Sequence, residues 1–77
     1  MLRAAVTGPQ LVRALEKVGF RVVRQRASHV QVRRTEPDGS VNTFPVPVHG
    51  ARSLKRGTLA GILRKAGLTP EGLQELL

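Results

Sequence analysis

Two prolines placed two residues apart constrain the fold of this chain more than any other feature. In the segment 41–49, Pro45 and Pro47 alternate with Val46 and Val48, the period-two pattern of a strand with one buried face. Proline has no backbone N–H, and the amides of residues i and i+2 in a strand point toward the same neighbour. One side of this strand therefore lacks two donors in succession. We expect the strand to lie at the edge of a sheet.

The other elements follow from periodicity and from the residues that start and stop each element. We predict a helix over about residues 8–18, strands over 21–26 and 29–34 joined by a reversal at 27–28, a hairpin turn over 36–40, a second helix from about 57–58 to 66, and a short helix from 69 that Leu73, Leu76 and Leu77 pack onto the body. Thr7 and Gln10 fit a capping box for the first helix, and Thr58 is the expected cap of the second. Gly39 suits a turn position with positive φ, and Gly67 suits a helix end.

This order predicts an α+β fold in a single domain, residues 1–77. The simplest sheet is a three-stranded antiparallel meander, and both main helices should cover one of its faces, because a small antiparallel sheet can leave the other face in water. The chain has no cysteine, and Phe20 and Phe44 are its only aromatic residues, so aliphatic packing must hold the core. A chain of 77 residues has no room for an internal cofactor cavity. We expect a shallow surface site and no cofactor.

Positive charge is concentrated in the middle of the chain. The net charge is +8, and residues 17–65 carry eleven lysines and arginines against Glu36 and Asp38. Phosphate backbones are the commonest partners of such a surface. An anionic membrane fits less well because the charges are not confined to one amphipathic helix. No apolar run approaches the roughly 18 residues of a membrane span, so we expect a cytoplasmic protein.

One histidine stands among arginines in RQRASHVQVRR, residues 24–34. If Val30 and Val32 face the core, alternation turns His29 to solvent, beside the turn at 27–28. Neighbouring cations disfavour a protonated imidazole, and a neutral imidazole can accept a proton. The residues alone leave two interpretations open, an idle surface histidine or a base among phosphate-binding arginines.

Several kinds of chemistry find no support in the sequence. Without cysteine, and with no acid near His29 or His49, neither a catalytic triad nor a metal site is expected. RNA cleavage through the 2′-hydroxyl remains open, because it needs only a base, an acid and cations for the phosphorane charge. Lys55 and Arg56 precede the second helix, where they either reach into solvent or share a phosphate with free amides. His49 is expected to be an exposed residue at a loop entry.

Four segments in order resemble the HicA toxins, also called YcfA-like proteins, which are small mRNA interferases of toxin–antitoxin pairs. The matching segments are LEKVGF at 15–20, RASH at 26–29, VPVH at 46–49, and RGTL through ILRKAGL at 56–68. No single segment is specific, but the four occur at matching separations over about residues 8–70.

The resemblance implies a fold like the double-stranded RNA-binding domain, and a histidine of a Gly-Ser-His motif that acts in RNA cleavage. That histidine is His29 here, while Ala27 replaces the glycine and so allows fewer backbone conformations before it. The implied partners are mRNA and a HicB-like antitoxin that covers the toxin. On this hypothesis His29 is a general acid or base, and the remaining predicted RNA-binding residues are Arg24, Arg26, Ser28, Arg33, Lys55 and Arg56.

Two other interpretations use the same basic surface. A non-catalytic double-stranded RNA-binding module would need no aromatic side chains, because RNA helices are recognised by shape and backbone. A domain that only binds an acidic protein partner is the weaker alternative. Single-strand binding by base stacking is disfavoured, since tryptophan and tyrosine are absent and both phenylalanines are expected in the core.

Overall fold

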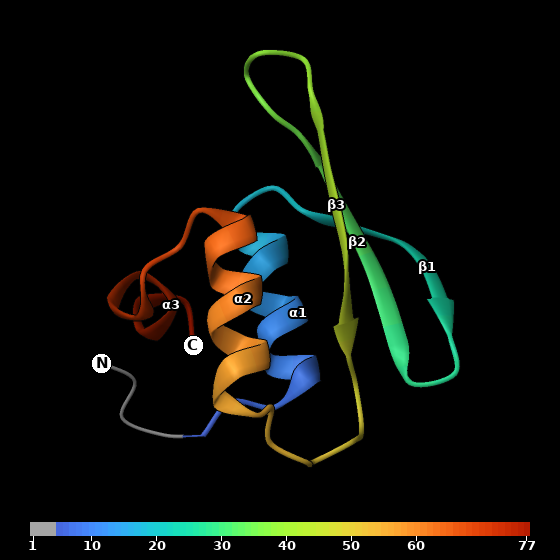
Figure 1. The fold of residues 1–77 in the computed structure, drawn as a ribbon, viewed down its shortest axis with the longest axis vertical. Coiled ribbons are helices and arrows are strands. Elements are labelled where there is room, and N and C mark those ends of the chain that lie inside the picture. The colour runs from blue at the N-terminus through green and yellow to red at the C-terminus, as the bar shows by residue number, and fades with distance from the viewer. Residues whose placement is uncertain (1–4) are drawn as a thin grey trace.

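Two helices, three strands and a short terminal helix are arranged as an open sheet covered on one face (Figure 1). The computed structural model describes residues 5–77. Its elements in chain order are α1 (Gly8–Lys17), β1 (Arg21–Arg26), β2 (His29–Thr35), β3 (Val41–Pro47), α2 (Arg56–Ala66) and α3 (Pro70–Leu76). The strands form one antiparallel sheet in the order β1-β2-β3. This confirms the predicted α+β fold and the meander.

The edge position predicted for β3 is confirmed, and one hydrogen bond explains how its prolines fit. The amide of Val48 donates to the carbonyl of Ser28, at 2.7 Å. Because successive amides of a strand point to opposite sides, the nitrogens of Pro45 and Pro47 point away from β2. The strand ends at Pro47 rather than at His49 as predicted, since Pro47 pairs with the first residue of β2 and only the turn lies beyond.

The first helix begins as the sequence predicts. The side chain of Thr7 accepts the amide of Gln10, and the side chain of Gln10 accepts the amide of Thr7, which completes the capping box. A Cβ at Gly8 would overlap the carbonyl oxygen of Pro47, so glycine lets the start of α1 approach the end of β3. This contact fixes α1 against the sheet close to the residue that pairs with His29.

The second helix begins earlier than predicted, and Thr58 is not its cap. The N-cap is Lys55, which makes no capping hydrogen bond from its side chain, and Arg56 is the first helical residue. The amide of Leu54 donates to the carbonyl of Val6, and Ser53 forms an isolated bridge with Thr7. These contacts hold residues 53–54 beside the start of α1, and α2 begins directly after them. Thr58 therefore lies inside the first turn.

The core lies between the sheet and the helices. It consists of Val6, Leu11, Ala14, Leu15, Phe20, Val30, Val32, Phe44, Val46, Ile62, Leu63, Ala66 and Leu73. Phe20 and Phe44 pack edge to face, with ring centroids 5.2 Å apart. Leu73 is buried and Leu76 packs at the margin of the core, but Leu77 is 47% exposed, so its predicted packing is wrong. No helix of residues 5–77 is long and apolar enough to cross a membrane.

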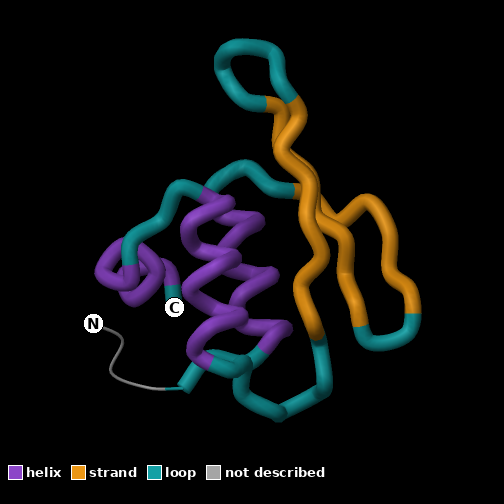
Figure 2. The backbone as a smooth tube through the Cα atoms, in the orientation of Figure 1, coloured by secondary structure: helices purple, strands orange, loops and turns teal. Residues whose placement is uncertain are grey.

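The β2–β3 hairpin extends beyond the helices (Figure 2). The side chain of Arg34 fastens it to the helices. Arg34 donates to the carbonyl oxygens of Val18 and Ala66, at the ends of α1 and α2, and its guanidinium lies over the ring of Phe20. It also makes two hydrogen bonds to the carboxylate of Glu36, at 2.6 and 2.9 Å. One side chain thus joins the hairpin to both helix ends and fixes the orientation of β2.

Candidate cationic site on the sheet

The open face of the sheet carries three rows of side chains that cross the strands. His29 pairs with Arg26 on β1 and Pro47 on β3. The next row joins Arg24, Gln31 and Pro45, and the third joins Arg21, Arg33 and Thr43. The intervening residues of β2, Val30 and Val32, are buried, so the rows lie on the solvent side. Successive rows are about 7 Å apart along β2.

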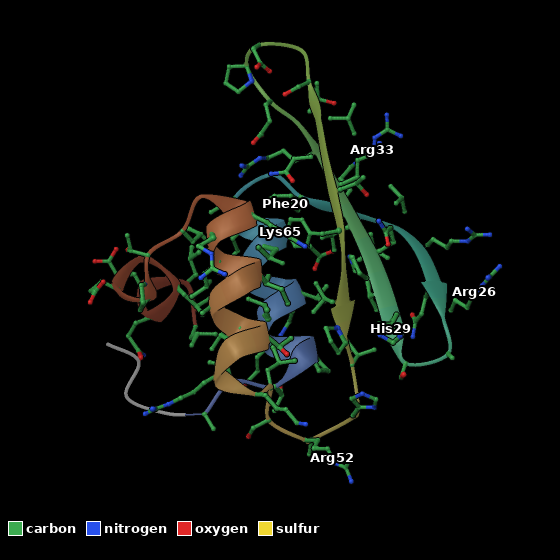
Figure 3. The ribbon with its side chains drawn as sticks, viewed as in Figure 1. Phe20, Arg26, His29, Arg33, Arg52 and Lys65 are labelled. Carbon is green, nitrogen blue, oxygen red and sulfur yellow. The ribbon has the colours of Figure 1, made fainter. Side chains whose placement is uncertain are left out.

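A shallow hollow occupies the first two rows. Arg24, Arg26, Ala27, His29 and Gln31 line it, and its volume is about 340 Å³. His29 is exposed, as predicted from alternation. Figure 3 shows His29 and Arg26 near the turn that joins β1 to β2, whereas Arg33 lies much farther along the sheet. The structure therefore brings three of the predicted residues, Arg24, Arg26 and His29, into one hollow.

The turn before His29 has an unusual backbone. Ala27 has φ of 51°, and it is the only residue other than glycine with positive φ in the described part of the chain. Glycine is favoured at such a position in two-residue hairpin loops. Ala27 therefore keeps the conformation that a glycine would adopt without strain, and His29 begins β2 opposite Arg26.

The other predicted residues lie outside the hollow. Ser28 is half-buried in the turn, and Arg33 belongs to the third row of the same face. Lys55 and Arg56 are exposed where α2 begins, on the side of the sheet that the helices cover (Figure 1). His49 is exposed in the loop after β3, as predicted. A single contact with all of these residues would have to wrap around the end of the sheet.

No acidic side chain belongs to the three rows, and two arginines face each other in the third. Arg21 is the pairing partner of Arg33. Like charges directly opposite each other on a sheet are destabilising. The acids of the β2–β3 hairpin instead lie at its far turn, where Glu36 binds Arg34 and Asp38 accepts hydrogen bonds from Ser40. The open face is thus a surface of uncompensated positive charge, which suits an anion.

Gln31 and Thr43 form a polar contact that the sequence reasoning missed. The side-chain nitrogen of Gln31 donates to the hydroxyl of Thr43 at 2.8 Å, and this hydroxyl donates to the carbonyl of Val32 at 2.9 Å. The contact depends on the register that sets Arg33 opposite Thr43. The predicted turn at 36–40 fixes which residues of the two strands pair, and this pairing could have predicted the contact.

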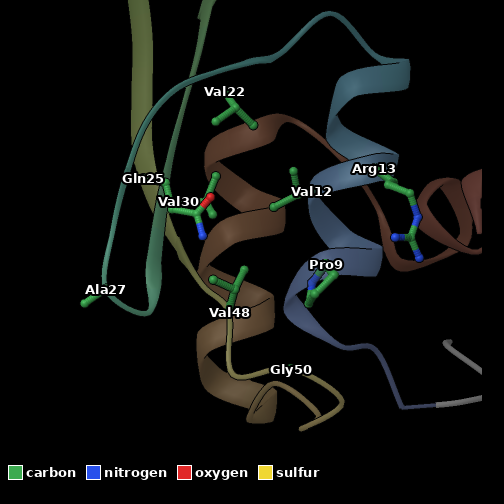
Figure 4. A pocket seen from close by; sticks show the side chains of 9 residues that line it. All are labelled: Pro9, Val12, Arg13, Val22, Gln25, Ala27, Val30, Val48 and Gly50. Carbon is green, nitrogen blue, oxygen red and sulfur yellow. The ribbon is translucent and has the colours of Figure 1, made fainter.

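A second hollow, of about 470 Å³, lies on the other side of β1 (Figure 4). Val12 and Arg13 of α1, Val22 and Gln25 of β1, and Val48 are among its lining residues. Val22 is 43% exposed, since β1 contributes no buried residue to the core. This groove shares Ala27 with the hollow around His29 but opens toward α1.

The two carboxyl groups of the β2–β3 hairpin whose pKa values are shifted lie at its far turn, away from His29. The hydrogen bond from Arg34 is the main reason that the pKa of Glu36 is lowered, and hydrogen bonds from Ser40 lower the pKa of Asp38. Both carboxylates therefore support the hairpin. Within residues 5–77 there is no group of three or more histidine, aspartate or glutamate side chains that could hold a metal ion.

Fold and site together define a small basic α+β protein with one exposed histidine in a cationic hollow. Comparison with protein-family models matches residues 8–68 to a family described as the HicA toxin of bacterial toxin–antitoxin systems. A search of curated proteins found no match. The match covers most of the chain, so the chain belongs to the HicA toxin family. It is a toxin of a toxin–antitoxin system, and the family implies a cognate antitoxin partner.

Proposed function

We propose that this toxin is a metal-independent endoribonuclease that cleaves mRNA, with His29 as general acid or base. The observation that carries the proposal is the hollow in which exposed His29 lies beside Arg24 and Arg26 with no acid in the same rows. The HicA family is generally associated with ribonuclease activity, which supports the same assignment. The proposed setting is cytoplasmic, and the proposed antitoxin is HicB-like.

The reaction uses the RNA itself as nucleophile. The 2′-oxygen attacks the adjacent phosphorus, the bond to the 5′-oxygen breaks, and the products are a 2′,3′-cyclic phosphate and a 5′-hydroxyl. His29 either takes the proton of the 2′-hydroxyl or gives one to the leaving oxygen, while solvent serves the other transfer. Arg24 and Arg26 stabilise the negative charge of the phosphorane. Arg33, Ser28, Lys55 and Arg56 are proposed to contact RNA outside this centre.

The test is cleavage of RNA in EDTA by the wild type and by His29→Ala. General acid–base catalysis contributes about 10²–10⁴-fold, so we expect the variant to lose activity by that factor. A matched control is His49→Ala, which removes the other histidine and should keep its activity. Cleavage that disappears in EDTA, or that survives in His29→Ala, would contradict the proposal.

The alternative is a double-stranded RNA-binding module without catalysis. The observation in its favour is that two of the three rows, with Arg21, Arg24 and Arg33, offer cations but no histidine. This alternative requires that RNA binds equally well to the wild type and to His29→Ala, and that ribonuclease-free wild type leaves the RNA intact. It therefore predicts a different result from the same pair of proteins.

A further inference from the structure

One amide in the hollow is held in a single orientation. The hydroxyl of Thr43 donates its only proton to the carbonyl oxygen of Val32, at 2.9 Å, because a carbonyl can only accept. The hydroxyl must then accept the hydrogen bond of Gln31, at 2.8 Å, and only the side-chain nitrogen of Gln31 can donate it. The amide nitrogen therefore faces Thr43 and the side-chain oxygen faces away from it.

This orientation leaves a hydrogen-bond acceptor in the hollow. Among residues 5–77 the side-chain oxygen of Gln31 has no hydrogen-bond partner, and Gln31 lines the hollow with His29, Arg24 and Arg26. Arginine side chains offer only donors, which suit phosphate oxygens. An amide oxygen is itself an acceptor and therefore repels phosphate oxygens. An acceptor at this place needs a donor on the bound molecule, and RNA offers the ribose 2′-hydroxyl and the amino and imino groups of bases.

We propose that the side-chain oxygen of Gln31 accepts a hydrogen bond from the 2′-hydroxyl of the nucleotide next to the one cleaved at His29. The proposal rests on RNA cleavage at His29. The two residues stand in neighbouring rows of β2, about 7 Å apart, so Gln31 reaches a neighbouring ribose rather than the attacking hydroxyl. The ribose lies on the backbone that the arginines hold and is the same in every nucleotide. Gln31 thus selects RNA over DNA at a position where the chemistry itself has no need of a 2′-hydroxyl.

The test uses synthetic RNA with a single 2′-deoxynucleotide. After the cleavage site has been mapped, the substitution is placed at the cleaved nucleotide or at either neighbour. At the cleaved nucleotide it removes the nucleophile and abolishes cleavage by every variant. At one neighbour it should lower kcat/KM of the wild type by about 3- to 10-fold, the effect of one hydrogen bond. In Gln31→Leu this neighbour effect should disappear.

Two further variants separate this role from a general effect on the sheet. Thr43→Val frees the amide to rotate and should lose part of the neighbour effect. Gln25→Leu makes the same chemical change in the groove on the other side of β1, and it should keep the full effect. A neighbour effect that is absent from the wild type, or equally large in Gln31→Leu, overturns the proposal. The proposal is also overturned if replacing a neighbouring adenine by purine, which removes only the amino group, lowers kcat/KM of the wild type but not of Gln31→Leu.

A binding measurement tests Gln31 even if the protein does not cleave RNA. In the His29→Ala background, the affinities for all-RNA and all-DNA strands of one sequence are compared by fluorescence anisotropy. The RNA preference should fall by about 3- to 10-fold when Gln31→Leu is added. If Gln31→Leu leaves the preference for RNA over DNA unchanged, the proposed role of Gln31 is wrong. If instead the protein binds RNA but does not cleave it, only the cleavage assay shows that failure.

Discussion

At the scale of single residues, Ala27 shows how the turn before His29 keeps its shape without glycine. Its φ of 51° lies in the left-handed region, where a residue with a Cβ is strained by about 1–2 kcal/mol. The sequence identified Ala27 as a departure from the family's Gly-Ser-His pattern. The structure adds that the backbone is the one that glycine favours, so backbone strain is the cost of alanine at this position.

We therefore expect Ala27→Gly to stabilise the protein. The relief of strain exceeds the added freedom of the unfolded chain, and the net gain should reach about 1 kcal/mol in urea unfolding. Ala60→Gly is the matched control, since Ala60 is exposed on α2 and its replacement should cost about 1 kcal/mol. Equal destabilisation by both changes would show that Ala27 is unstrained.

At the scale of elements, most of the fold was predictable because local signals agree with tertiary needs. The capping box at Thr7, the paired prolines of β3 and Gly39 in its turn, with φ of 88°, each act where the sequence places them. The start of α2 was not predictable from local signals. Backbone bonds from residues 53–54 to the segment before α1 decide it, and such long-range contacts leave no periodic pattern.

The candidate site was partly predictable for the same reason. Alternation along β2 exposes His29, and the short reversal at 27–28 brings Arg24 and Arg26 to it. The role of Arg34 was missed, although alternation places it on the buried face after Val32. An arginine at such a position needs carbonyl and carboxylate partners, and only the packed helix ends and the hairpin turn supply them.

Arg34→Met should lower the stability of the domain. The methionine retains apolar contact with Phe20 but loses the hydrogen bonds to both helix ends and to Glu36, and we expect a cost of about 1–3 kcal/mol in urea unfolding. Arg33→Met is the control, because the neighbouring residue lies on the open face opposite Arg21 and its loss should not destabilise. Similar losses for both variants would argue against Arg34 as the anchor.

The bond between Arg34 and Glu36 also predicts a loss of stability in acid. The pKa of Glu36 is lowered in the folded state, chiefly by the hydrogen bond from Arg34, relative to an ordinary value of 4.5. A carboxylate of lowered pKa stabilises the fold fully above that ordinary value, and the contribution is lost as the pH falls through the lowered pKa. The melting temperature of Glu36→Gln should therefore vary less with pH below about 4.5 than that of the wild type. Parallel curves would exclude this linkage.

At the scale of the whole molecule, the net charge of +8 is organised by the fold. Alternation on β1 and β2, together with the bulge between Val22 and Arg24 that shifts β1 by one residue, places Arg21, Arg24, Arg26 and Arg33 on one face, while the core lies between the other face and the helices. A chain with the same composition but a shifted register would bring these arginines to the core side. The cationic face is thus a property of the sheet rather than of composition.

RNA binding by this face should depend steeply on salt. Each neutralised phosphate of a single strand contributes about −0.7 to the slope of log K against log salt, so the four arginines of this face together contribute about −3 to the slope. Arg33→Gln should reduce the slope by about 0.7. Arg64→Gln, near the end of α2, should leave it unchanged, and the measurement is fluorescence anisotropy over a series of salt concentrations. A slope that Arg64→Gln reduces as much as Arg33→Gln would place the RNA on the helices.

The two open edges of the sheet are protected from pairing with another molecule in different ways, by prolines on β3 and by arginines on β1. The outer edge of β3 lacks donors at Pro45 and Pro47, and no solvent condition restores them. The edge of β1 is interrupted by a bulge between Val22 and Arg24, and the repulsion of like-charged neighbours adds to that protection. Salt screens this repulsion. High ionic strength therefore weakens the protection of the β1 edge, which then depends on the bulge, and leaves the protection of the β3 edge unchanged.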